Sequence, residues 1–288
     1  MTDSWLRLSA RTGAASVDAL ANFLLERGAP GVVLKRRGVE AYFPRSRENA
    51  ILKQSVRRYL RDLEKLDGGG ARARLEWKII ADQNWHDSWR RFIKPRRVGK
   101  SFWVTPSWLK APKFRRRQVI VIEPGLAFGT GTHATTRGCL EFLEQVADSL
   151  RGRSFTALDV GTGAGILAIA LVKLGAKRVS AIDNDPVALQ VARENLIRNK
   201  VAGRVRLSGT RLNDVKGRFS VVVANLTAET ILELAKPLEK KVVAKGFLIL
   251  SGLLPQKADA VLRHFRIKFH VLKQKRGREW VTLLLQRK

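Results

Sequence analysis

The chain has 288 residues, of which 45% are hydrophobic and 28% are charged. These values indicate a folded protein with room for two domains, and they exclude an intrinsically disordered chain. Lysine and arginine total 55 against 25 acidic residues, a formal net charge of +30, which predicts a non-specific, salt-dependent attraction to polyanions such as RNA.

A single cysteine, Cys139, lies in an apolar helical stretch. One cysteine excludes an internal disulfide and permits a reducing compartment, and we interpret this one as a core residue rather than a nucleophile. The N-terminal sequence lacks the basic-then-apolar pattern of a secretory signal. No apolar run approaches the roughly 18 residues of a membrane span. We therefore expect a cytoplasmic protein that contacts no membrane and binds no metal.

The first 80 residues alternate short strand-like and helical patterns. In chain order the periodicity predicts strand 5–9, helix 17–27, strands 31–35 and 39–43, helix 47–65 and strand 75–80. The order β-α-β-β-α-β predicts a small ferredoxin-like domain over 1–80. The second helix carries basic residues that fit either a docking face or ordinary solvated surface: Lys53, Arg57, Arg58 and Arg61.

A tryptophan-rich segment follows, in which Trp85 and Trp89 are four residues apart. That spacing places both rings on one side of a helix, so we expect residues 81–98 to form a helical linker anchored by its tryptophans. Beyond it, apolar runs predict strands over 101–105 and 119–122.

A long loop rich in glycine and threonine occupies residues 123–136, EPGLAFGTGTHATT. The loop leads into an apolar helical run, and Thr135 or Thr136 is positioned to cap that helix. A permissive loop at a helix N-terminus is suited to cover a ligand. A P-loop is excluded because no lysine follows its last glycine.

The most informative stretch is 156–185, TALDVGTGAGILAIALVKLGAKRVSAIDND. It predicts a buried strand, a turn with Gly161, Gly163 and Gly165, a helix over 166–173, a second strand, and then Asp183. Glycines let a ligand approach the free N–H groups of a strand–helix turn. An acid about 20 residues on is placed to bind ribose hydroxyls. The unit therefore predicts an adenosine-cofactor site.

The remaining chain predicts further alternation of helices and strands. Helices are expected over 186–199, 230–238 and 255–265, and strands over 205–208, 219–224, 246–250, 269–272 and 280–285. The fold class is α/β, a doubly wound sheet that ends in an antiparallel pair. Asn225 directly follows the strand 219–224, at the end of the sheet where such folds bind ligands.

The glycine pattern discriminates between cofactors. A dinucleotide fingerprint that begins at Gly161 would need a small residue at Ile166, and one that begins at Gly163 would start too late in the turn. The segment 159–165, DVGTGAG, instead resembles motif I of class I methyltransferases.

Together, PGLAFGTGTHATT, motif I and Asn225-Leu226 resemble the family of methyltransferases that modify large-subunit ribosomal protein eleven. The resemblance covers nearly the whole chain. It implies a class I methyltransferase domain over 99–288 with a mostly parallel seven-stranded sheet and an antiparallel C-terminal strand. It also implies a substrate-recognition role for 1–80, S-adenosylmethionine as the cofactor, and methylation of the α-amine and lysine ε-amines of that ribosomal protein.

The same resemblance assigns the site residues. The cofactor contacts implied for the family, together with neighbouring residues of the lid and glycine turn, are Thr136, Gly161, Asp183, Asn225, Gly163, Phe128 and Gly129. Asn225 cannot act as a base, so we expect it to position the amine. His133 is the only candidate base in the lid, although its ring can equally serve to pin the loop. Asp159 is expected to orient the glycine turn or the cofactor.

Three other functions remain open on the sequence. An RNA methyltransferase would use the positive charge, but no Asn-Pro-Pro-aromatic motif follows strand 219–224. A nicotinamide dehydrogenase would leave the lid and Asn225 unexplained. A non-catalytic RNA-binding protein would need no ribose-binding acid.

Overall fold

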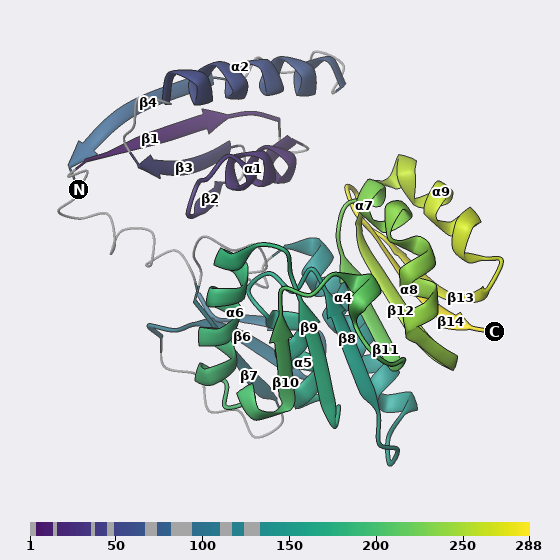
Figure 1. Cartoon of the computed structure of the whole chain (residues 1–288). Coiled ribbons are helices and arrows are strands. Elements are labelled where there is room, and N and C mark those ends of the chain that lie inside the picture. The colour runs from purple at the N-terminus through teal and green to yellow at the C-terminus, as the bar shows by residue number, and fades with distance from the viewer. Residues whose placement is uncertain are drawn as a thin grey trace. The chain divides into compact units, whose positions relative to one another are not determined.

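The computed structural model describes residues 4–13, 16–35, 38–44, 49–66, 74–81, 94–109, 117–123 and 133–288. The chain divides into two compact units, with the boundary between Lys94 and Pro95, and each unit is described by itself (Figure 1).

The N-terminal unit is a four-stranded antiparallel sheet with two helices. Its strand order is β2-β3-β1-β4, so that each βαβ pair is split by a strand of the other, as in ferredoxin-like folds. The elements are β1 (Ser4–Arg11), α1 (Val17–Glu26), β2 (Val32–Lys35), β3 (Gly38–Pro44), α2 (Asn49–Leu66) and β4 (Arg74–Ala81).

Alternation along the strands builds the core of this unit. Leu6, Leu8 and Ala10 of β1 are buried together with apolar residues of both helices, as the period of two in a strand requires when one face is covered. The rings of Phe23 and Tyr59 stack 4.0 Å apart and join α1 to α2. Because both helices pack into the same cluster, the opposite face of the sheet carries the more polar residues of β1.

The prediction of a helical linker over 81–98 is wrong at its C-terminal end. Residues 96–98 form strand β5 (Arg96–Val98), which pairs with β6 (Phe102–Pro106). The strand forms because Val98 is buried and Gly99 turns the chain back with a φ of +56°. The tryptophan pair at 85 and 89 lies outside the described residues.

The C-terminal unit is built on a seven-stranded sheet with strand order β10-β9-β8-β11-β12-β14-β13. Its strands are β8 (Thr156–Val160), β9 (Arg178–Ile182), β10 (Val205–Ser208), β11 (Phe219–Asn225), β12 (Val242–Leu253), β13 (Phe269–Arg276) and β14 (Val281–Arg287). All neighbours pair in parallel except β14, which is antiparallel to both β12 and β13. The predicted fold, a doubly wound parallel sheet with one antiparallel C-terminal strand, is confirmed.

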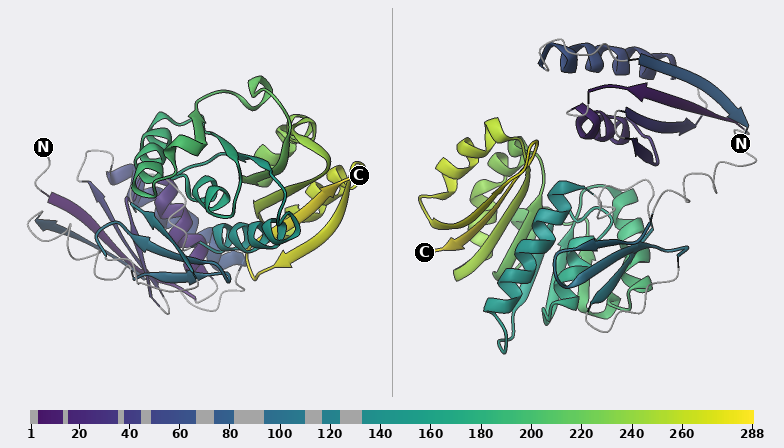
Figure 2. Two further views of the ribbon diagram at one scale, coloured as in Figure 1. Left: turned by 90° about the horizontal axis from the view of Figure 1, so that it is seen from below. Right: turned by 180° about the vertical axis from the view of Figure 1, so that it is seen from behind.

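Helices cover both faces of this sheet (Figure 2). They are α4 (Ala134–Ser149), α5 (Ile166–Lys173), α6 (Pro186–Arg198), α7 (Ala228–Glu233), α8 (Ala235–Lys241) and α9 (Pro255–Phe265). Val221 and Val223 of β11 join the core cluster on the side of α4 to α6, whereas Val222 and Ala224 join the cluster on the side of α7 to α9. Burial on both faces explains why the strands appear in the sequence as continuous apolar runs.

A separate three-stranded sheet, β5-β6-β7, includes β7 (Gln118–Ile122) and belongs to the same unit. Glu144 of α4 holds its first turn, because its carboxylate accepts hydrogen bonds from the backbone nitrogens of Lys100 at 2.8 Å and Ser101 at 2.7 Å. The sequence predicted two of these strands but gave no sign of the third or of its anchor.

The helix predicted over 230–238 is two helices. α7 ends at Glu233 and α8 begins at Ala235. Pro237 explains the break, because it has no N–H to bond the carbonyl four residues earlier and its ring would strike that carbonyl in a continuous helix. None of the helices in the described ranges is both long enough and apolar enough to cross a membrane.

Candidate active site

The glycine turn between β8 and α5 is tied to the next strand through its backbone. Gly161 has a φ of +70°, and the N–H groups of Gly161 and Thr162 both donate to the carbonyl oxygen of Ile182, at 2.9 and 3.0 Å. The N–H of Gly163 donates to Asp183 Oδ2 at 2.8 Å. The turn and the predicted ribose acid are therefore in direct contact.

The carboxylate of Asp183 is held in place by backbone groups. Besides Gly163, it accepts a hydrogen bond from the N–H of Asp185, which reaches Oδ1 at 3.1 Å. Each carboxylate oxygen has a second lone pair, and the side chain is half-buried rather than enclosed. Asp183 is thus fixed in orientation and retains acceptor capacity for the hydroxyl groups of a ligand.

Asp159 braces the turn from beneath. Its Oδ2 accepts hydrogen bonds from the Thr162 hydroxyl at 2.7 Å and from the Ala168 N–H at 3.1 Å, while its Oδ1 is buried without a partner among the described residues. Burial raises the pKa of Asp159 to about 7; the two hydrogen bonds oppose this, and the charge of Asp183 adds to it. Its contacts agree with the expected role in orienting the glycine turn.

Asn225 ends β11 beside the glycine turn. Ala224 is in register with Val160 on one side, and Asn225 is in register with Ser251 on the other. A Cβ built on Gly161 would lie 2.5 Å from Leu226 Cδ2, so only glycine lets the turn approach the residue after Asn225. In the described part of the chain, Asn225 Oδ1 is buried and has no hydrogen-bond partner.

The start of α4 corrects the predicted cap. His133, not Thr135 or Thr136, is the N-cap residue, and its Nδ1 lies 2.6 Å from Thr135 Oγ1 and accepts the Thr135 N–H at 3.4 Å. Both threonines lie inside the first turn and are buried. A T-shaped contact with Trp280, with ring centroids 5.3 Å apart, holds the imidazole from the other side.

A buried hydroxyl network supports this helix start, and sequence reasoning missed it. Ser251 Oγ donates to the Thr135 carbonyl at 3.3 Å and shares a hydrogen bond of 2.8 Å with Thr282 Oγ1. Gly138 lets the helix approach so closely that a Cβ there would collide with the Thr282 side chain. Burial raises the pKa of the Cys139 thiol, and a hydrogen bond with Ser251 opposes that rise. The buried position of Cys139 agrees with its interpretation as a core residue.

Asn195 of α6 and Asn199, the C-cap residue of that helix, bond the chain at the end of β7, and Asn195 also bonds the glycine turn. Asn195 Nδ2 donates to the Ala164 carbonyl at 2.9 Å, and its Oδ1 accepts the Glu123 N–H at 2.9 Å. Asn199 makes a matching pair of bonds with the backbone of Val121, at 2.9 and 2.6 Å. A pair of amides four residues apart on one helix face was the only sequence signal for this link.

The structure thus brings most of the predicted residues to one end of the sheet. The glycine turn is hydrogen-bonded to Asp183, and Leu226 packs on the same turn. Ser251 pairs with Asn225 in the sheet and bonds the first turn of α4. In that turn, the Thr136 hydroxyl is buried without a partner among the described residues. Two predicted cofactor contacts, at 128 and 129, lie outside the described residues.

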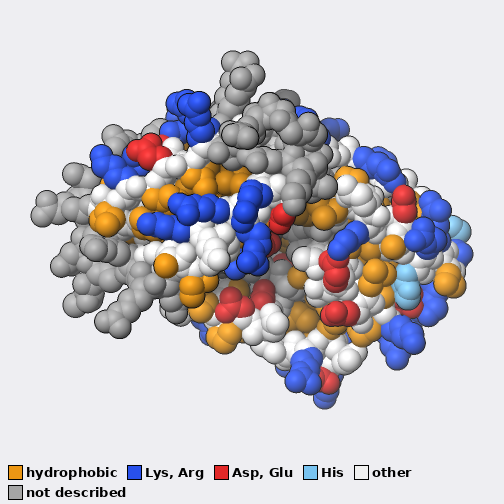
Figure 3. All heavy atoms as spheres, turned by 90° about the horizontal axis from the view of Figure 1, so that it is seen from above, with side chains coloured by type: hydrophobic (Ala, Val, Ile, Leu, Met, Phe, Trp, Pro, Cys, Tyr) orange, Lys and Arg blue, Asp and Glu red, His pale blue; other side chains and the backbone are white. Residues whose placement is uncertain are grey.

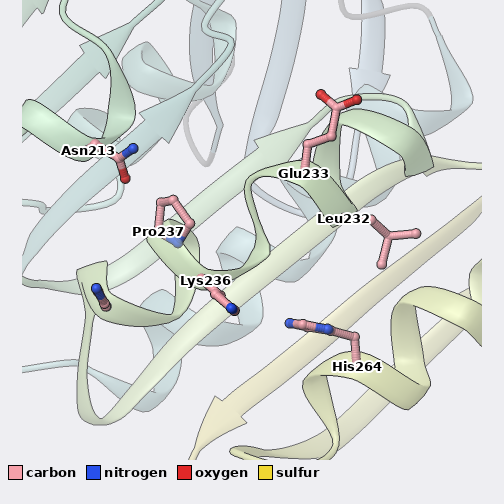
Figure 4. Close-up of a pocket in the computed structure, with 7 residues that line it drawn as sticks. Asn213, Leu232, Glu233, Lys236, Pro237 and His264 are labelled. Carbon is pink, nitrogen blue, oxygen red and sulfur yellow. The ribbon is translucent and has the colours of Figure 1, made fainter.

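A solvent-exposed pocket elsewhere in the unit holds none of these residues. It lies among the short helix over Leu212–Asp214, α7, α8 and α9 (Figure 4), where Lys236 and His264 point toward one another. The acceptors and glycines suited to an adenosine ligand lie at the carboxyl ends of β8, β9 and β11 instead, so we place the site there. The pocket residues are Asn213, Leu232, Glu233, Lys236, Pro237, Lys240 and His264.

Comparison with known proteins identifies the family. The model of "Ribosomal protein L11 methyltransferase (PrmA)" matches residues 4–288. Proteins with that name from Geobacter sulfurreducens and Pelobacter propionicus are 38% and 34% identical, over 99% and 100% of this chain and 98% and 99% of their own. A crystal structure of ribosomal protein L11 methylase from Lactobacillus delbrueckii subsp. bulgaricus aligns with a TM-score of 0.61 and 32% identity, over 67% of this chain and 98% of that one.

The predicted family and enzyme class are confirmed by a match that spans both units. The chain belongs to the ribosomal protein L11 methyltransferase family and is an S-adenosylmethionine-dependent protein methyltransferase.

Proposed function

We propose that this enzyme methylates the α-amine and lysine ε-amines of ribosomal protein L11, and that the end of the sheet built from Gly161, Asp183 and Asn225 is where it does so. The observation that carries the proposal is the contact between the glycine turn and the Asp183 carboxylate, beside an Asn225 carboxamide oxygen that lacks a partner among the described residues. Chains with the family name match this one from end to end.

The residues at this end of the sheet fit S-adenosylmethionine, which supplies a methyl group on an electrophilic sulfonium sulfur. The glycines at 161 and 163 leave space against the backbone, and Asp183 offers carboxylate lone pairs for ribose hydroxyls. The Thr136 hydroxyl and the second oxygen of Asp159 are further polar groups without a partner in the described ranges. We assign Phe128 and Gly129 of the lid to the same site on the resemblance alone.

Asn225 is assigned to the amine. Transfer breaks the sulfur–methyl bond and forms a carbon–nitrogen bond, which needs the lone pair of a neutral amine aimed along the sulfur–methyl axis. A lysine has an ordinary pKa of about 10.4, so its proton leaves to solvent before transfer. An amide oxygen such as Asn225 Oδ1 accepts an N–H bond from the amine and thereby directs the lone pair.

His133 is assigned to the structure of the lid base rather than to proton abstraction. Its Nδ1 caps α4 through Thr135, and its ring packs against Trp280. If this ring nitrogen moved away to take a proton from the amine, the backbone N–H groups in the first turn of the helix would lose their acceptor. Replacing His133 by Asn, which also caps helices, is expected to preserve turnover, whereas loss of the acidic limb of the pH–rate profile in that variant would restore His133 as the base.

The direct test is mass spectrometry of purified L11 after incubation with the enzyme and S-adenosylmethionine. We expect mass increases in steps of one methyl group, mapped to the N-terminus and to lysines. Unmodified L11, with label from the methyl donor recovered in ribosomal RNA instead, would contradict the proposal and favour the RNA methyltransferase considered above.

A further inference from the structure

The amino ends of the seven-stranded sheet carry a concentration of cations. The segments that enter β8, β9, β11 and β12, including the first residue of β9 and the last turn of α8, carry six exposed basic side chains, here named the amino-end cluster: Arg153, Lys177, Arg178, Lys216, Arg218 and Lys240. These four strands are adjacent in the sheet. With about 4.8 Å between neighbours, the cluster extends over roughly 15 Å.

Strand register places these residues at one level. Thr156 is paired with Arg178, Ala157 is paired with Val221, and Phe219 is paired with Val242. The turns immediately before those pairs therefore lie side by side at the same edge. Chain segments 87 positions apart in sequence, from Arg153 to Lys240 (240 − 153), thus form one surface.

Few acids neutralise this surface. In the part of the chain that the structure describes, no side chain of the amino-end cluster forms an ion pair or a hydrogen bond with an acid. Nearby Asp148 is paired with Arg151 at 2.7 Å, and buried Glu239 is paired with Lys268 at 2.7 Å. The other acid of these turns is Asp214. By contrast, the face drawn in Figure 3 intersperses acidic side chains among basic ones.

We propose that the amino-end cluster is a docking surface for the sugar–phosphate backbone of RNA. Unpaired cations that converge on one edge neutralise phosphates and release their counterions, which is the main source of sequence-independent affinity for nucleic acid. None of the large exposed hydrophobic side chains in the described ranges belongs to the turns of the cluster. A membrane surface, which takes apolar side chains together with cations, is therefore a poorer fit.

The surface is separate from the catalytic end. β8 has five residues, so about 16 Å of strand lies between its two ends, and RNA held at the amino ends leaves the carboxyl ends accessible. The choice of RNA among polyanions rests on the proposed function, since the proposed substrate is a ribosomal protein and ribosomes contain RNA. The binding itself needs neither cofactor nor L11, so it is measured without them.

The test compares two triple variants of the full chain. One removes three cations of the cluster (Arg178→Gln, Lys216→Gln and Arg218→Gln). The matched control removes three exposed arginines of α2 (Arg57→Gln, Arg58→Gln and Arg61→Gln). Fluorescence anisotropy with a labelled RNA hairpin, over a series of salt concentrations, gives affinity and its salt dependence. Circular dichroism and S-adenosylmethionine affinity show that each variant is folded.

We expect the cluster variant to lower the slope of log affinity against log salt by about one for each phosphate that is no longer neutralised, and the control to leave the slope nearly unchanged. Equal reductions in the two variants would overturn the proposal, because they would mean diffuse attraction to the whole charged surface. So would an unchanged cluster variant, or binding to anionic phospholipid vesicles but not to RNA.

Discussion

At the carboxyl ends of β8, β9 and β11 the chain places Gly161, Asp183 and Asn225, whereas the turns entering the same strands carry Arg153, Arg178 and Arg218. Near the carboxyl ends, polar atoms of Asn225, Asp159 and Thr136 are buried without a hydrogen-bond partner among the described residues. The amino ends are exposed and rich in charge. On the two proposals above, one sheet offers a site for a small, partly cationic ligand at one edge and a surface for a large polyanion at the other.

This difference shows which side chains must be held in one position and which need not be. Groups at the carboxyl ends are fixed by short hydrogen bonds to backbone, such as that between Gly163 and Asp183, because chemistry depends on alignment. Cations at the amino ends have no such restraint, and attraction to phosphates requires only charge at the right density. Substitutions at the carboxyl ends should therefore change turnover or cofactor affinity, and substitutions at the amino ends should change RNA affinity.

The largest expected effect comes from the buried acid at the catalytic end. The pKa of Asp159 rises from 3.8 to about 7 in the folded protein, so the folded state binds the proton more tightly. Its contribution to stability is full below about pH 4 and is lost as pH rises through about 7, at most about 4 kcal/mol. Asp159→Asn should remove that dependence, measured as urea midpoints at about pH 5 and about pH 8. Parallel pH curves for the two proteins would contradict it.

Asn225→Ala should lower kcat by about 100-fold or more, the usual cost of losing one positioned polar group in an active site, with little change in S-adenosylmethionine affinity. The measurement is single-turnover methylation of L11 beside calorimetric titration of the cofactor. Equal losses in turnover and cofactor affinity would reject the positioning role.

Asp183→Asn should weaken S-adenosylmethionine binding by about 10- to 100-fold, since bonds to a charged acceptor contribute about 1.5–3 kcal/mol. Asp185→Asn is the matched control. Asp185 lies two residues on, its side chain accepts the Val187 N–H as the cap of α6, and Asn caps helices as well. Comparable losses in both variants would show that the loop, and not the Asp183 carboxylate, determines affinity.

Thr282→Val should lower the free energy of unfolding by about 1 kcal/mol, because it removes the hydroxyl that bonds Ser251 while keeping the shape of the side chain. Thr282→Ser keeps the hydroxyl and should retain the hydrogen bond. Thermal melting of both variants separates the two contributions, and a larger loss in the serine variant would point to packing against Gly138 instead.

The smallest effect is expected at the opposite edge. The triple variant of Arg178, Lys216 and Arg218 should methylate purified L11 at close to the unmodified rate, within about two-fold, since exposed surface charges contribute little to structure. A clear loss of turnover on free L11 would mean that the two ends are not independent.

Much of this organisation was predictable from sequence where one residue type determines the outcome. Apolar runs located the strands after residue 156, and glycines followed by a distant acid pointed to the end of the sheet at which we propose that the cofactor binds. The prediction of one helix over 230–238 was wrong, because the apolar pattern outweighed Pro237, which separates α7 from α8.

The remainder depends on partners distant in sequence. His133 caps α4 although a ring nitrogen is not a typical cap, and Glu144 anchors a turn more than forty residues earlier. Strand β5 has only three residues and an exposed, basic pattern, so its pairing with β6 has no local signal. The hydrogen bond between the Ser251 and Thr282 hydroxyls could not be predicted, because it forms only when β12 and β14 lie side by side beneath α4.

The carboxamide of Asn195 joins two segments that follow strands of different sheets. It donates to the carbonyl of Ala164 in the glycine turn and accepts from the N–H of Glu123, where the chain leaves β7. An aspartate of the same shape cannot make both bonds because it has no N–H to give. An Asn195→Asp replacement would therefore break the bond to Ala164, and the position of the glycine turn is coupled to the end of β7 through this amide.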